Sequence, residues 1–199
     1  MIHVDAQSEP ASFNAAVRQK GVAWLQKNNI PLDQPLPPKT ELEPYWRSCL
    51  DDLHESYRGC CAYLSIFFER YPGGGSVDHF IAKSKRADLA YEWSNYRLAC
   101  SRMNSRKRDY DDVLDPFAIE TGWFRLEPVT GRIYPDPGLS ADLQHTVQAT
   151  IDRLGLDDAG CREIRARHYQ EYCENEYTSG FLKKRSPFVW TEVVRQGLL

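Results

Sequence analysis

The sequence lacks any apolar run close to the roughly 20 residues that a membrane-spanning helix requires, so we expect no membrane association. The first residues, Met1-Ile2-His3-Val4-Asp5, lack the basic and apolar regions of a secretory signal peptide. Internal repeats and low-complexity tracts are also absent, which excludes a repeat architecture. We therefore expect a cytoplasmic protein whose six cysteines are buried thiols or metal ligands rather than disulfides.

A strong excess of one charge is also missing, because the formal net charge is only −3. This balance argues against general affinity for nucleic acid. The distribution is uneven, however: the segment from Lys83 to Asp109 holds eight basic residues and three acidic ones. Such a local excess suits an anionic backbone, but it is also typical of a solvated helix face. Composition leaves both interpretations open.

The chain is long enough for one domain with a sizeable core, or for a small core with appendages. Its 42% hydrophobic and 12% aromatic residues are typical of a globular protein. We predict an α+β fold, with a mainly helical frame around a small hairpin and helix. Three segments are expected: an N-terminal helix with a proline-rich connector (1–43), a central core (44–115), and a C-terminal hairpin with helices (116–199).

In the N-terminal segment, apolar spacing predicts a helix over residues 10–28, although Gly21 weakens the pattern. Prolines between residues 31 and 38 predict a stiff, extended connector. The central segment predicts the order strand, loop, strand, helix. The strands are expected at 76–80 and 96–99, and the helix at about 102–110 with Ser101 as its cap.

The C-terminal segment predicts a hairpin joined through Thr130-Gly131 and then three helices. We expect these elements to be core and frame, packed on the central core or on a partner. The expected helix boundaries are Ser140 to Gly155, Asp157 to about Tyr177, and Ser186-Pro187 onward. The histidines expected to have structural or surface roles are His54, His145 and His168.

Five polar residues follow one another in the central segment. Asp78 and His79 are adjacent, Asn95 comes sixteen residues after His79, Asn104 nine after Asn95, and Lys107 three after that. An imidazole beside a carboxylate, with two amides and a lysine downstream, suits metal-assisted phosphodiester hydrolysis. Each carboxylate or amide alone is also typical of turns and helix caps. The ordered set favours a site.

Val77-Asp78-His79, with Asn95, Asn104 and Lys107, resembles the HNH nuclease motif in its DH…N…N variant. The later spacing is also similar to that in the HNH domain of RNA-guided DNA nucleases. The resemblance implies a ββα-metal core, which matches the predicted order of strand, loop, strand and helix. It further implies an endonuclease that acts on duplex DNA rather than RNA.

The resemblance also implies a role for each residue. His79 would be the general base that takes a proton from the attacking water. Asp78 and Asn104 would bind Mg²⁺ or Mn²⁺ through their oxygens. Asn95 would hold the loop and orient His79, and Lys107 would face the phosphate or leaving group. The basic residues expected to contact the DNA backbone are Lys83, Lys85, Arg86, Arg102 and Arg106.

Many proteins with this motif carry a zinc knuckle made of two Cys-x-x-Cys pairs. Here Leu64 and Met103 stand where the second cysteines would be, so only Cys61 and Cys100 remain. Two ligands cannot hold a closed tetrahedral zinc site. We therefore expect no structural zinc and apolar packing in its place, with Cys60 as the one neighbouring thiol that could add a ligand.

The segment Tyr57-Arg58-Gly59-Cys60-Cys61-Ala62-Tyr63, the Asp78-His79-Phe80 block with Lys83-Ser84, and the chain length are similar to the HNH subunit of Septu-type and retron-associated anti-phage systems. This similarity implies a defence effector that acts with an ABC-type ATPase. Two other functions stay open: a catalytically silent HNH fold that binds nucleic acid or protein, and a purely structural partner subunit. The intact aspartate, histidine and second asparagine favour the nuclease.

Overall fold

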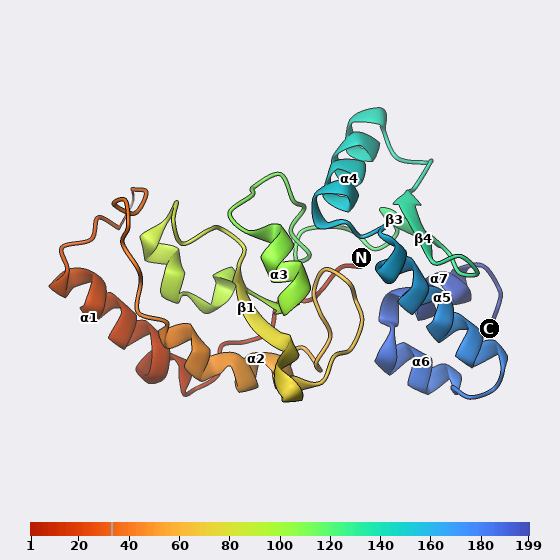
Figure 1. Cartoon of the computed structure of the whole chain (residues 1–199), viewed down its shortest axis with the longest axis horizontal. Helices are drawn as coiled ribbons and strands as arrows, with labels where there is room; N and C mark the ends of the chain where they lie inside the picture. Colours follow the sequence, from red (N-terminus) through yellow and green to blue (C-terminus); the bar gives the residue numbers. More distant parts are fainter. Residues whose placement is uncertain (33) are drawn as a thin grey trace. The chain divides into compact units, whose positions relative to one another are not determined.

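The computed structural model describes residues 1–32 and 34–199, with the backbone alone at Pro72 and Gly73. Residue 33 of the predicted connector therefore lies outside the described residues. Helices and short strands are mixed along the chain, as an α+β fold requires (Figure 1). No helix in the described ranges has both the length and the apolar character needed to cross a membrane.

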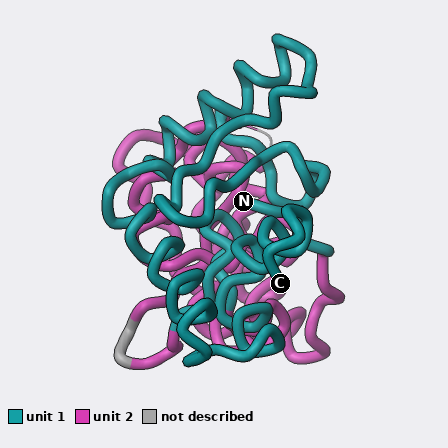
Figure 2. Tube along the Cα trace, turned by 90° about the vertical axis from the view of Figure 1, so that its right-hand side faces the viewer, with its two compact units in different colours: residues 1–5, 60–68, 112–199 teal, residues 6–59, 69–111 magenta. Residues whose placement is uncertain are grey.

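The chain forms two compact units, which Figure 2 colours separately. Unit 1 comprises Met1–Asp5, Cys60–Phe68 and Asp112–Leu199, and unit 2 comprises Ala6–Gly59 and Glu69–Asp111. These units do not follow the three predicted segments. The N-terminal helix belongs with the central strands, because tertiary contacts join pieces of chain that linear spacing keeps apart.

Unit 2 begins with one helical stretch, made of the π-helical η1 (Asn14–Arg18) and α1 (Gln19–Lys27). It starts later than the predicted residue 10. Phe13, directly before it, is fully buried and packs edge-on against Trp93 and Tyr96, with ring centroids 5.5 and 5.7 Å away. The predicted apolar face of this helix therefore forms part of the core of unit 2.

Close packing explains why a glycine stands at position 21, which the sequence pattern did not suggest. A Cβ built on Gly21 would lie 2.1 Å from Cγ of Tyr91, in the 3₁₀ helix η4 (Ala87–Tyr91). Tyr91 is buried, and its hydroxyl donates to the carbonyl of Glu43 at 2.8 Å. The glycine therefore allows α1 to approach a ring that has little room to move.

We expect Gly21→Ala to destabilise the fold, although alanine is normally the better helix former. Overpacking against Tyr91 should cost about 1–3 kcal/mol, which outweighs the gain of up to about 1 kcal/mol from helix propensity. The matched control is Gly180→Ala in α6 (Ser179–Arg185), because a Cβ there meets nothing within 4 Å. Urea unfolding followed by circular dichroism compares the two. Equal stabilisation by both substitutions would show that α1 does not approach Tyr91 closely.

The central hairpin of unit 2 pairs β1 (Gly75–His79) antiparallel with β2 (Tyr96–Cys100). Helix α3 (Ser101–Lys107) follows β2 at once and packs against both strands (Figure 1). The predicted order of strand, loop, strand and helix is confirmed. The helix boundaries differ: Ser101 donates to the carbonyl of Gly74 at 3.2 Å instead of capping, and Arg108, with φ +48° and ψ −128°, ends the helix.

Shorter elements surround this hairpin. The remaining elements of unit 2 are the 3₁₀ helix η2 (Tyr45–Cys49), α2 (Leu50–Ser56), the π-helical η3 (Arg70–Gly74) and the 3₁₀ helix η5 (Trp93–Asn95). Both η2 and α2 contact β1. The helix predicted from Pro44 is thus present as two consecutive pieces.

Unit 1 contains the predicted hairpin as β3 (Phe124–Glu127) paired antiparallel with β4 (Arg132–Pro135). Helix α4 (Ala141–Leu154) follows with the predicted ends. The hydroxyl of Ser140 accepts from the Leu143 amide at 3.4 Å, and Gly155 takes the left-handed conformation at φ +56°. These are the usual ways to begin and end a helix.

The second predicted helix of unit 1 is wrong in extent, because α5 (Ala159–Cys173) ends before Tyr177. The helix α6 lies beyond the predicted end and was not expected, and Asn175, at φ +62°, lies between α5 and α6. Asp157 does not cap α5, because its Oδ1 accepts from the Ile133 amide of β4 at 2.9 Å. Thr178 caps α6 by accepting from the Phe181 amide. The last helix, α7 (Pro187–Arg195), begins where predicted.

Of the three histidines expected to have structural or surface roles, His54, His145 and His168, only His168 is buried. Its Nδ1 shares a hydrogen bond with the hydroxyl of Ser186, at the start of α7. Burial, and then the nearby Arg185, lower the pKa of His168 to about 4. Its burial and its hydrogen bond to Ser186 are consistent with the structural role expected of His168.

Candidate functional site

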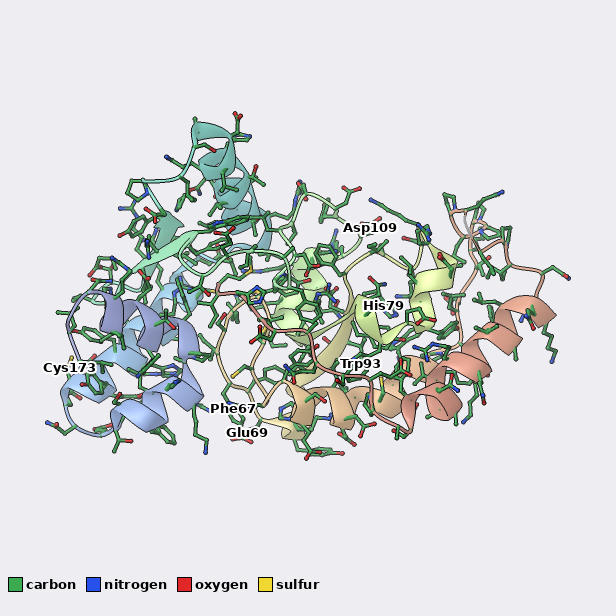
Figure 3. All side chains as sticks on the ribbon, turned by 180° about the vertical axis from the view of Figure 1, so that it is seen from behind. Phe67, Glu69, His79, Trp93, Asp109 and Cys173 are labelled. Carbon is green, nitrogen blue, oxygen red and sulfur yellow. The ribbon has the colours of Figure 1, made fainter. Side chains whose placement is uncertain are left out.

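A cleft of about 870 Å³ opens beside β1 in unit 2. Asp78 and His79 at the end of β1, Lys83 in the following loop and Asn104 in α3 all line it. Figure 3 labels His79 together with Asp109, another residue of the cleft wall. Of the five residues predicted to form a site, the structure therefore brings Asp78, His79 and Asn104 to one cavity.

His79 is held in one orientation by its neighbours. Its Nε2 lies 2.9 Å from the carbonyl oxygen of Ala90. A carbonyl can only accept, so Nε2 carries the hydrogen and Nδ1 is the acceptor nitrogen. The ring also packs edge-on against Trp46 and Tyr96, with centroids 4.8 and 5.1 Å away. The side chain is only 6% exposed.

The surroundings keep His79 uncharged. Burial lowers the pKa of His79 to about 3, and the positive charge of Lys83 acts in the same direction. The hydrogen bond to Ala90 and the charge of Lys107 have smaller, opposing effects on this pKa, the first raising it and the second lowering it. The imidazole is therefore neutral at physiological pH, and its Nδ1 lone pair can accept a proton. A low pKa also makes it a weak base, which limits its efficiency unless substrate binding changes the surroundings.

The Asn95 side chain is hydrogen-bonded to the loop that joins β1 and β2 at two points, Ile81 and Leu89. Its Oδ1 accepts from the amide of Ile81 at 2.8 Å. Its Nδ2 donates to the carbonyls of Ile81 and Leu89, at 2.9 and 3.1 Å. The next carbonyl after Leu89 belongs to Ala90, the partner of His79. The buried amide thus has the contacts expected of a residue that holds the loop, although it does not line the cleft.

Lys107 lies differently from the predicted orientation toward a phosphate. The side chain is fully buried, and its ammonium donates to the carbonyl of Phe80 at 2.9 Å. The same nitrogen lies 5.2 Å from the centroid of the Phe80 ring. Burial lowers the pKa of Lys107, an effect that the carboxylate of Asp78 opposes. Lys107 therefore supports the loop after β1 rather than lining the cleft.

Only one of the five cations predicted to contact DNA lines the cleft, namely Lys83. Its ammonium lies 5.2 Å from the Trp46 ring centroid. Lys85 forms an ion pair with Asp111 at 2.8 Å, and Arg86 donates to Asp88 at 2.8 Å. The two predicted cations on α3 lie outside the cleft lining as well, and they are Arg102 and Arg106.

The sequence did not identify several residues of the cleft wall. Trp46 and Arg47 come from η2, and Arg70 from η3. Their distance from the motif along the chain gave no signal of this proximity. Arg108 lay in the basic segment already noted, but no pattern distinguished it from its neighbours.

The residues that line the cleft fit a hard divalent cation. Asp78 has a carboxylate and Asn104 an amide carbonyl, and both residues line the same cavity. Mg²⁺ is commonly bound by one or two such ligands and completes its shell with water and phosphate. Within the described residues, no group of three or more His, Cys, Asp or Glu side chains could hold a metal ion. An ion here would have few protein ligands.

Cys61 and Cys100, the two cysteines at the zinc-knuckle positions, belong to different units of the fold. Cys61 and half-buried Leu64 are in unit 1, whereas Cys100 and fully buried Met103 are in unit 2. The thiol of Cys60 contacts the carbonyl of Lys184 at 3.7 Å. Met103 thus packs in the core of its unit.

No protein-family model matches the chain, and no curated protein matches its sequence.

Proposed function

We propose that the chain is a metal-dependent endonuclease of the HNH type, which hydrolyses phosphodiester bonds in DNA. The observation that carries this proposal is the convergence of Asp78, His79 and Asn104 on one cleft. The order of β1, β2 and α3 also supports it, because a ββα-metal site is built on two strands and the helix that follows them. The motif spacing in the sequence points to the same class.

In this proposal, Nδ1 of His79 accepts a proton from the water that attacks the phosphorus. The hydrogen bond from Nε2 to Ala90 keeps the ring aimed and stabilises the imidazolium that forms. Asp78 and Asn104 would hold the divalent cation, which supplies positive charge for the phosphate oxygens when bound. Asn95 keeps the Ala90 carbonyl in place through the loop.

We further propose that the nuclease is a bacterial anti-phage effector with an ABC-type ATPase as its partner. The support is the similarity of the segments around Cys60 and His79 to the HNH subunits of such systems. In this arrangement, helices of unit 1 would bind the partner.

A catalytically silent HNH-fold subunit, which binds nucleic acid or protein, is the second candidate. The observation that favours it is burial: Asp78 is 1% exposed and His79 is 6% exposed, and the pKa of His79 is about 3. A metal-dependent cleavage activity separates the two candidates.

We expect Asp78→Ala and Asn104→Ala to raise the Mn²⁺ concentration that gives half-maximal cleavage by at least about tenfold. Each substitution removes an oxygen ligand from a site that has few. The matched control is Asp109→Ala, which removes an exposed carboxylate from the wall of the same cleft. Cleavage rates over a Mn²⁺ titration provide the measurement. Unchanged half-saturation in both ligand variants would show that the metal binds elsewhere.

A further inference from the structure

We propose that the substrate backbone is held inside the cleft by three cations, Arg47, Lys83 and Arg108, and not by the basic residues on the outer face of the loop and α3. The identity of the bound polymer as DNA rests on the proposed function. The three cations come from separate elements: η2, the loop after β1, and the residue that follows α3. All three line the cleft that Asp78 and His79 also line.

These three side chains are available to an anion. In the part of the chain that the structure describes, neither the Lys83 ammonium nor the guanidinium groups of Arg47 and Arg108 make a hydrogen bond or an ion pair with protein. The contact of Lys83 is the face of Trp46, which leaves its three donors unused. Arg70 also lines the cleft, but it is paired with Asp51 at 2.6 Å.

Three of the other basic groups near the motif already have acceptors. Lys85 and Arg86 are paired with Asp111 and Asp88, and Lys107 is buried against the Phe80 carbonyl. A cation that must leave a carboxylate before it binds a phosphate contributes less to affinity than one with no protein partner. The pairing of Lys85 and Arg86 therefore favours the cleft over the outer side of the loop, and Arg102, which is exposed on α3, lies outside the cleft lining.

Exposure gives the three cations an order of depth. Lys83 is half-buried, whereas Arg47 and Arg108 are exposed. The Lys83 ammonium also lies over the Trp46 ring, which itself packs edge-on against His79. We therefore assign Lys83 to the phosphate that reacts, and the two arginines to phosphates on either side of it.

The backbone of Arg108 provides a separate indication. Its φ of +48° is a conformation that glycine adopts more readily than any other residue. An arginine at this position costs stability, and such strain is often found at functional sites. Arg108→Gly should therefore raise the melting temperature by a few degrees and still weaken DNA binding. If Arg108 had a purely structural role, Arg108→Gly would change the melting temperature without weakening DNA binding.

The test measures binding of a fluorescent DNA duplex by anisotropy, in Ca²⁺ to suppress cleavage, over a series of salt concentrations. Lys83→Gln, Arg47→Gln and Arg108→Gln should each weaken binding roughly five- to tenfold at 0.1 M salt and reduce the salt slope by about one. Controls with the same charge change are Lys85→Gln and Arg102→Gln. They should alter affinity less than about twofold.

Arg58→Gly is the control for backbone strain, since Arg58 has φ +52° and lies outside the cleft lining. It should raise the melting temperature without changing affinity. The proposal is overturned if the two control glutamines weaken binding as much as the cleft variants, or if the wild-type chain does not bind the duplex. If the wild type cleaves DNA and the cleft variants bind it with unchanged affinity, the three-cation assignment is wrong and the proposed nuclease activity stands. If the cleft variants bind DNA more weakly but the wild type does not cleave it in Mg²⁺ or Mn²⁺, the three-cation assignment is supported and the proposed nuclease activity is wrong.

Discussion

Replacing His79 with alanine is expected to lower the rate of DNA cleavage roughly 10²- to 10⁴-fold, the usual contribution of a general base. The substitution removes the Nδ1 acceptor that would take the proton from water. It leaves Asp78 and Asn104 in the cleft, so the half-saturating metal concentration should change little. Initial rates on a fluorescent duplex, at saturating Mn²⁺, measure the effect.

The control for His79→Ala is Tyr96→Phe. Tyr96 packs against the imidazole and donates to the same Ala90 carbonyl at 2.8 Å, so this variant loses a buried hydrogen bond near the site but keeps the base. It should unfold about 1 kcal/mol more easily than the wild type and retain most of its activity. Comparable rate losses in both variants would mean that His79 acts through packing and not as a base.

Asn95→Asp is expected to lower both stability and activity, although the two side chains have almost the same size. The carboxylate can still accept from Ile81, but it cannot donate to the carbonyls of Ile81 and Leu89. A buried charge facing two carbonyls should cost at least about 2 kcal/mol in unfolding free energy. The loop that carries Ala90 should then loosen, so we expect cleavage to fall about tenfold or more.

Urea unfolding and cleavage rates, both measured where the variant is folded, test this expectation. The control is Asn14→Asp, which makes the same chemical change on the exposed surface of η1. That variant should stay within about 0.5 kcal/mol of the wild type. An Asn95→Asp protein with wild-type stability would show that the amide does not hold the loop in solution.

Local signals in the sequence predicted much of the hairpin and helix framework. The β1, β2 and α3 order follows from short apolar runs interrupted by polar junctions, and the ends of α4 follow from Ser140 and Gly155. Helix α6 was missed because the segment between α5 and α6 has neither glycine nor proline to mark a new element. Its signals are Asn175, which tolerates a positive φ, and the capping hydroxyl of Thr178.

The predicted site depended on order along the chain, and order does not determine which way a side chain points. Asp78, His79 and Asn104 meet in the cleft, but Lys107 turns to the Phe80 carbonyl on the inner side of α3. Trp46 and Arg47 reach the cleft through tertiary contacts of η2 with β1, which no local pattern encodes. The ion pairs of Lys85 with Asp111 and of Arg86 with Asp88 likewise depend on the folded positions of the two aspartates.

The most direct test of the nuclease is the conversion of supercoiled plasmid to nicked and linear forms by the purified full chain. Metal removal should not unfold the protein: because no structural zinc is expected, EDTA-treated protein should keep its circular dichroism spectrum and melting temperature. Cleavage by the wild-type and His79→Ala proteins is then compared with Mg²⁺, with Mn²⁺, and with EDTA. We predict cleavage by the wild type with either metal, none with EDTA, and almost none by the variant. Intact plasmid with both metals, or equal cleavage by His79→Ala, would contradict an HNH endonuclease.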